Sequence, residues 1–154
     1  MRTDKTERFV SLHGFFAFQY PSTWVNETDE SGHYIFYNSS GGQGVLRIML
    51  MENEFEGADA ARLMLEEVYK QNKDFTPELL ATKESKFVYF VKQHEVNGSD
   101  FTVYYWATAK YDKVVLFTFT LQTALRELPK AREEKAEIEE MIATFAFLPG
   151  EHHG

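Results

Sequence analysis

Hydrophobic side chains fill both alternating sets of positions between residues 86 and 122. The segments KFVYFVKQHEV (86–96) and FTVYYWATAK (101–110) flank Asn97-Gly98, a pair typical of a tight β-hairpin turn. A two-residue loop sets Tyr89 opposite Trp106, whereas a four-residue loop shifts the partners but keeps the faces, because side chains alternate with period two. One face of this hairpin then carries Tyr89, Val91, Tyr104 and Trp106, and the other carries Val88, Phe90, Phe101, Val103 and Tyr105.

A second hairpin, turning near Tyr111-Asp112, adds the strand VVLFTFTLQ (114–122). A loop of even length places Phe117 and Phe119 on the face of Trp106, and a three-residue loop would exchange the two faces. Both faces of the sheet are apolar in either register. A sheet with one wet face would instead alternate apolar and polar residues. The sequence therefore predicts that other elements cover each face.

Two amphipathic helices are available as covers. In GADAARLMLEEVYKQNKDF (57–75), apolar side chains recur at helical spacing: Ala61, Met64, Leu65 and Val68. A second helix is predicted over about 129–143, with Pro129 in its first turn and a stripe of Ile138, Met141 and Ile142. The expected fold class is α+β, an antiparallel meander β-sheet sandwiched by helices.

The first part of the chain is predicted to begin as a meander. Phe16, Phe18 and Tyr20 alternate with Ala17 and Gln19, Pro21 ends that strand, and Trp24 folds back over it. Strands are also expected at 33–38, at 44–52 and, as a short last strand, within 144–147. Residues 1–13 are interpreted as a flexible lead-in, 14–148 as a single domain and 149–154 as a disordered tail.

Two motifs resemble a known group of proteins. The opening GFFAFQYPSTW (14–24) is similar to the G-F-x-F-x-Y-P-x-x-W start of the PsbP/Mog1/DcrB-like superfamily, and EIEEMIATFAF (137–147) is similar to its closing helix and strand. The resemblance implies an α/β/α sandwich around an antiparallel sheet. It implies little about activity, and members of that group mostly bind other molecules.

Composition excludes several kinds of site. The chain has 154 residues, enough for one well-buried domain, and no cysteine, so it has no disulfide, thiolate zinc site or thiol nucleophile. Its net charge of −8 disfavours nucleic acid and anionic membranes as partners. No apolar run of bilayer length and no signal-peptide pattern is present, which leads us to expect a cytoplasmic protein.

The residues that carry reactive chemistry lack a recognisable arrangement. None of the five histidines falls in a metal-binding motif, and His152-His153 in the tail are interpreted as a disordered end. His94-Glu95 beside the Asn97-Gly98 turn is weighed as an acid/base pair and as an exposed strand end, and the latter is favoured. SSGGQG (39–44) joins two predicted strands, so a hairpin loop is favoured over a phosphate cradle. We expect no enzyme activity, no cofactor and no metal.

The candidate binding residues are aromatic or charged. Tyr20 and Trp24 are interpreted as core residues, because aromatic side chains bury large areas. Arg47 interrupts an apolar face and marks either a wet groove or a sheet edge. A ligand pocket between sheet and helix would be lined by Tyr89, Tyr104 and Trp106. A partner surface on the acidic helix would use Glu133, Glu134, Glu137 and Glu140, although a solvated helix face is favoured.

The function expected from the sequence is a non-catalytic protein-binding or adaptor module. One alternative is a small-molecule carrier with an apolar pocket between sheet and helix. The other is an immunity or chaperone protein for a secreted toxin. A protein partner is expected in the first and third cases.

Overall fold

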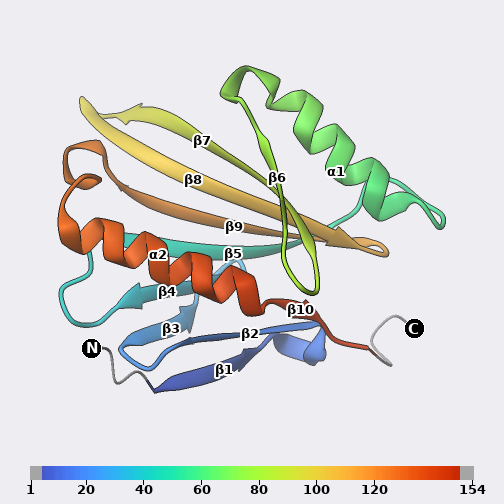
Figure 1. Cartoon of the computed structure of the whole chain (residues 1–154), viewed down its shortest axis with the longest axis horizontal. Helices are drawn as coiled ribbons and strands as arrows, with labels where there is room; N and C mark the ends of the chain where they lie inside the picture. The colour runs from blue at the N-terminus through green and yellow to red at the C-terminus, as the bar shows by residue number, and fades with distance from the viewer. Residues whose placement is uncertain (1–4, 150–154) are drawn as a thin grey trace.

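A computed structural model describes residues 5–149 of the chain, and within them it contains ten strands and two α-helices. Seven strands form one antiparallel sheet in the order β3-β4-β5-β9-β8-β7-β6, and three form a small sheet in the order β1-β2-β10. Helix α2 crosses in front of the large sheet beside the small sheet, and α1 lies toward the opposite corner (Figure 1). The predicted α+β sandwich is confirmed.

The large sheet is built from strands of unequal length. Its strands are β3 (Trp24–Thr28), β4 (Tyr34–Asn38), β5 (Gly44–Glu52), β6 (Glu78–Ala81), β7 (Lys86–Val96), β8 (Ser99–Lys110) and β9 (Lys113–Gln122). The remaining elements are β1 (Thr6–Val10), β2 (Phe16–Pro21), β10 (Ala146–Phe147), α1 (Ala60–Gln71), α2 (Pro129–Thr144) and three short 3-10 turns at 12–14, 73–75 and 123–125.

Both long hairpins have two-residue loops. Asn97-Gly98 connects β7 to β8, and Val96 pairs with Ser99, so Tyr89 stands opposite Trp106. Tyr111-Asp112 connects β8 to β9, which sets Trp106 opposite Phe117. Asn97 and Gly98 both have positive φ (53° and 82°), the conformation that this turn requires. The predicted distribution of side chains between the two faces is therefore confirmed.

Two predictions about the start of the chain are wrong. Residues 6–10, expected to lie in a flexible lead-in, form β1, which pairs with β2 along its whole length. Strand β2 does not pair with β3: the chain leaves the small sheet at Pro21 and enters the large sheet at Trp24. The meander thus starts at β3, because the aromatic face of β2 packs across the core against the large sheet. The tail beyond Pro149 lies outside the described residues.

One hydrophobic core fills the space between the large sheet, the small sheet and α2. Its fully buried side chains include Phe16, Phe18, Trp24, Phe36, Phe87, Trp106, Phe117, Phe119, Ile138 and Phe145. The aromatic surplus of the sequence is largely used here. Trp24 is confirmed as a core residue: it is 1% exposed, and its indole Nε1 donates to Glu137 Oε1 at 3.1 Å.

The two helices cover their faces to different degrees. Six residues of α2 are buried, but Ala60 is the only buried residue of α1. The apolar stripe of α1, including Leu65 and Val68, is only half-buried although it lies against β7 and β8. The outer face of the sheet is therefore incompletely sealed beside α1.

Candidate binding groove

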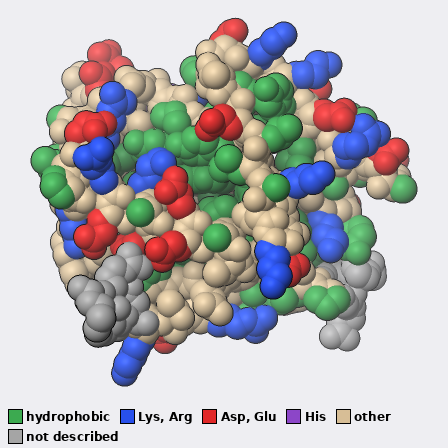
Figure 2. All heavy atoms as spheres, in the orientation of Figure 1, with side chains coloured by type: hydrophobic (Ala, Val, Ile, Leu, Met, Phe, Trp, Pro, Cys, Tyr) green, Lys and Arg blue, Asp and Glu red, His purple; other side chains and the backbone are tan. Residues whose placement is uncertain are grey.

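A small hollow lies on the inner face between the large sheet and α2, where a ligand pocket is one alternative raised by the sequence. Tyr89 and Tyr104 line a hollow of about 370 Å³ beside α2, and both are half-buried. Figure 2 shows hydrophobic side chains gathered in a depression on this face, with charged side chains of both signs at its edge. Trp106 does not line the hollow, because it is 1% exposed and lies in the core, 5.2 Å from the Tyr89 ring.

The charged groups around this hollow are already paired with one another. The Lys135 ammonium lies 5.3 Å from the Tyr89 ring centroid and 5.1 Å from that of Tyr104, and it bonds to Glu139 at 2.8 Å. Burial raises the pKa of the Tyr89 phenol, and the nearby Lys135 opposes that shift. Arg126 and Arg132 both approach Glu127, within 3.7 and 4.0 Å. These charged side chains already interact with one another, so the hollow offers a ligand few unpaired charged groups.

The acidic helix is only in part a surface. Glu133 and Glu140 are exposed, but Glu134 and Glu137 are buried, so the prediction that these two belong to a partner surface is wrong. The carboxylate of Glu134 accepts hydrogen bonds from the backbone N–H groups of Gln43 (2.7 Å) and Gly44 (3.2 Å). The SSGGQG segment joins β4 to β5, as predicted. The two hydrogen bonds to Glu134 attach the end of this segment, at Gln43 and Gly44, to α2.

Arg47 lies on the open part of the outer face. Its side chain is 45% exposed, and its Nε is 3.8 Å from a carboxylate oxygen of Asp29. The neighbouring Val45 on the same strand is also exposed. Strand β5 lies inside the sheet and not at its edge, and Arg47 lines an open depression of about 700 Å³ together with Val45, which fits the wet-groove interpretation. The acidic neighbour of Arg47, Asp29, is half-buried.

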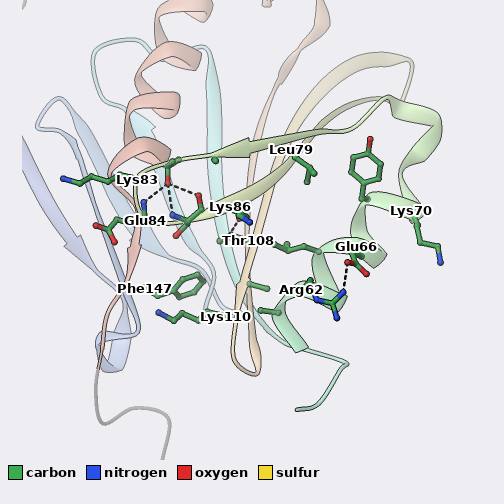
Figure 3. A pocket seen from close by; sticks show the side chains of 17 residues that line it. Arg62, Glu66, Lys70, Leu79, Lys83, Glu84, Lys86, Thr108, Lys110 and Phe147 are labelled. Atoms are coloured by element: carbon green, nitrogen blue, oxygen red, sulfur yellow. Dashed lines mark hydrogen bonds and ion pairs between the residues drawn. The ribbon is translucent and has the colours of Figure 1, made fainter. Parts of the chain in front are cut away.

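A larger groove lies beside α1, at a place where no site is predicted from the sequence. It has a volume of about 930 Å³ and is bounded by α1, the β6–β7 hairpin, the end of β8 and Phe147 of β10. In Figure 3, Arg62 and Glu66 project from α1 on one side, while Lys110 and Phe147 lie on the other. Four segments far apart in the sequence therefore meet around one depression.

The inner surface of this groove is apolar and accessible. It includes Leu65 and Tyr69 of α1, Leu79 and Ala81 of β6, Ala109 of β8 and Phe147. Leu79 is 71% exposed, and Tyr69 is 37% exposed. Exposed apolar side chains that are contiguous, rather than scattered singly, mark sites of interaction.

The hairpin wall of the groove is held by its own turn. Thr82 donates its backbone N–H to Ser85 O, and its hydroxyl accepts from the Ser85 N–H at 3.0 Å. At the base, the Thr108 hydroxyl donates to Lys86 O at 2.7 Å, which ties β8 to the first residue of β7. These bonds fix the position of Leu79 and Ala81 relative to β8 and so keep the groove formed.

The described lining of this groove contains no histidine. Among residues 5–149, no group of three or more His, Asp or Glu side chains is placed to hold a metal ion. His94 Nε2 lies 3.2 Å from the Tyr105 hydroxyl, and no contact between His94 and Glu95 is seen in this region.

Neither of the two described helices combines the length and the apolar character needed to span a membrane. His152 and His153 lie outside the described residues.

A family model matches residues 4–147, nearly the whole chain. The chain belongs to the DUF3805 family. The description of that family is a domain of unknown function, so membership identifies relatives without assigning an activity. No curated protein sequence matches the chain.

Solved structures support the fold. A crystal structure from Bacteroides thetaiotaomicron VPI-5482 is 22% identical with a TM-score of 0.74; the match covers 93% of this chain and 48% of that chain. LpqN, described as involved in cell envelope biogenesis of Mycobacterium tuberculosis, is 9% identical with a TM-score of 0.53, over 96% of this chain and 93% of LpqN. Cyanobacterial PsbP from Synechocystis sp. PCC 6803 is 10% identical with a TM-score of 0.47, over 93% and 92%. The two matches with TM-scores above 0.5 show that this chain shares their fold, and this chain spans about half the length of the Bacteroides structure.

Proposed function

We propose that this protein is a non-catalytic binding module that takes a segment of a protein partner into the groove between α1, the β6–β7 hairpin and β8. The observation that carries the proposal is the apolar, accessible lining of that groove, with Leu79 71% exposed. Burying an apolar side chain of this size contributes about 1.5–3 kcal/mol of favourable free energy, so a partner that covers Leu79 would bind more tightly.

The shape of the groove favours a chain segment over an enclosed ligand. Small-molecule sites bury roughly 70–90% of their ligand's surface. Here Leu79 and Tyr69 are open to solvent, and so is Arg62 at the α1 wall, with its side chain 57% exposed. A ligand in this groove would keep one side in water, as does a segment of a larger protein that lies along a surface.

Site-specific photo-crosslinking tests the proposal. A photoreactive amino acid is placed at position 79 and, as a matched control, at position 12, because Leu12 is also 71% exposed but does not line the groove. We expect a protein adduct from cells of the source organism at position 79 and not at position 12. The captured protein is then purified and its Kd measured directly.

The purified partner allows a quantitative control. Tyr69→Ser/Leu79→Ser removes two groove side chains, and Tyr37→Ser/Leu12→Ser removes two of nearly equal exposure elsewhere (36% and 71%). We expect the first pair to weaken binding by at least about tenfold, a change of about 1.4 kcal/mol, and the second to leave Kd unchanged. Equal affinity for both double variants would remove the groove from the proposal.

A small-molecule carrier is the second candidate, and the volume of the groove is the observation in its favour. About 930 Å³ lies near the upper end of small-molecule sites, roughly 300–1,000 Å³. Native mass spectrometry of protein purified from its own cells distinguishes the two candidates. A bound small molecule that is lost in Tyr69→Ser/Leu79→Ser would favour the carrier.

A further inference from the structure

The charges around the groove have the opposite balance to those of the whole chain. Five lining residues are basic (Arg62, Lys70, Lys83, Lys86 and Lys110) and two are acidic (Glu66 and Glu84). The chain as a whole has 24 Asp and Glu against 16 Lys and Arg. The groove is therefore a local region of positive charge on an acidic protein.

Most of these basic side chains form no ion pair with an acidic side chain among residues 5–149. Arg62 is paired, at 2.8 Å from Glu66 and 3.4 Å from Asp59. Across residues 5–149, no acidic side chain lies within ion-pair distance of the ammonium groups of Lys70, Lys83, Lys86 or Lys110. Lys110 lies over aromatic rings instead, 5.4 Å from the Tyr111 centroid and 6.0 Å from that of Phe147.

We infer that the occupant of the groove is an acidic, amphipathic segment of the partner protein. Its apolar side chains cover Leu65, Leu79 and Phe147, and its carboxylates face the lysines at the rim. This inference rests on the proposed function and adds the chemistry of the partner to it. Electrostatic complementarity of this kind sets specificity and association rate more than it sets affinity.

The same observations disfavour a polyanion such as nucleic acid. A long polyanion extends beyond the groove and meets the rest of a surface whose net charge is −8. A short peptide segment responds mainly to charges within about 8 Å at physiological ionic strength. The apolar lining also has no counterpart in a phosphate backbone, whereas leucine and phenylalanine side chains match it.

A random-peptide phage library provides the test. It is panned against the wild-type protein and counter-selected against Tyr69→Ser/Leu79→Ser, so that only groove-dependent peptides remain. We expect these peptides to combine Asp or Glu with Leu, Phe or Trp, and to bind more weakly as salt is raised.

Two charge variants measure the contribution of the lysines. Lys86→Gln/Lys110→Gln removes two positive charges from the groove, and Lys5→Gln/Arg132→Gln removes the same number from outside it. Exposed ion pairs predict that the first variant weakens binding of a selected peptide by about 2- to 30-fold. The second should bind like the wild type, and circular dichroism melts check that both are folded.

The outcomes separate this inference from the proposed function. Groove-dependent peptides that are neutral or basic, or whose binding is insensitive to salt and to Lys86→Gln/Lys110→Gln, would overturn the acidic partner and leave a peptide-binding groove. If no groove-dependent peptide is selected, both proposals fail. Dodecanoate, tested in parallel by native mass spectrometry, would then show whether the groove takes an amphiphilic carboxylate instead.

Discussion

The buried carboxylate of Glu134 provides a direct test of how α2 is joined to the sheet. It is fully buried and accepts the backbone N–H groups of Gln43 and Gly44, at 2.7 and 3.2 Å, at the point where β5 begins. Glu134→Ala removes both acceptors and leaves the helix backbone intact. The neighbouring Glu133 is exposed on the same helix, so Glu133→Ala is the matched control.

The expected loss of stability follows from the burial of the two donors. The Gly44 N–H is buried, and a buried donor left without an acceptor costs about 1–3 kcal/mol. The Gln43 N–H is only partly buried, so water replaces much of its lost bond. Removing a buried charge also recovers some desolvation cost. We therefore expect Glu134→Ala to lower the free energy of unfolding by about 1–3 kcal/mol.

Urea denaturation followed by far-UV circular dichroism measures this change. The corresponding fall in Tm is about 2–4 °C for each kcal/mol in a protein of this size. Glu133→Ala should stay within about 0.5 kcal/mol of the wild type, as expected for an exposed surface substitution. If the two variants unfold at the same urea concentration, Glu134 does not stabilise the junction and the reasoning is refuted.

The pH dependence of stability gives a second readout of Glu134. Burial raises the pKa of this carboxyl above its ordinary 4.5, while the Gln43 and Gly44 amides and Lys130 oppose the shift and Glu137 adds to it. The folded state therefore keeps a proton that the unfolded chain releases. Its stabilising effect is complete below pH 4.5 and is lost as pH rises through the folded pKa. Relative to Glu134→Gln, the wild type should lose stability with rising pH; a gain would contradict this sign.

Three further predictions concern packing. Trp24→Ala should lower the free energy of unfolding, measured by urea denaturation, by about 3–5 kcal/mol, because the Trp24 side chain is only 1% exposed. The control Val25→Ala, at an exposed position, should lower it by about 0.5 kcal/mol at most. Equal losses in the two variants would exclude Trp24 from the core. Gly44→Ala places a Cβ 2.6 Å from the Phe119 ring and 2.7 Å from the backbone oxygen of Thr120, so we expect overpacking to lower the free energy of unfolding by about 1–3 kcal/mol in the same assay. Wild-type stability would show that both the ring and the strand shift at little cost. Hydrogen exchange should show lower protection in α1 than in α2, because α1 buries one residue and α2 buries six; equal protection would contradict this.

The faces of the large sheet were predictable because its turns are local. Asn97-Gly98 sets the β7–β8 register through two adjacent residues, and period-two alternation then assigns every following side chain. The small sheet was not predictable in this way. Its pair Phe147–Phe16 joins residues from opposite ends of the chain, and β1 is charged enough at Glu7 and Arg8 to resemble a solvated segment.

The error over the acidic helix has a different cause, because the sequence did contain the signal. Ala131, Glu134, Ile138 and Met141 lie at spacings of three and four, so helical periodicity places Glu134 on the buried stripe. The prediction nevertheless places Glu134 at the surface, because glutamate side chains are rarely buried in proteins. The backbone donors that make its burial tolerable belong to a loop about ninety residues earlier, at Gln43 and Gly44.

The groove beside α1 shows what a hydrophobic pattern leaves undetermined. Leu65 lies on the predicted apolar stripe of α1, yet it is only half-buried and lines the groove. The pattern specifies which side chains avoid water, but the same pattern results whether the chain itself or a partner provides the cover. Leu79 is the decisive case: it belongs to a short edge strand, contacts the groove and is 71% exposed. Leu12 is equally exposed, so exposure alone does not indicate a partner: Leu79 supports the proposed partner because it adjoins Tyr69 and other apolar side chains around one groove.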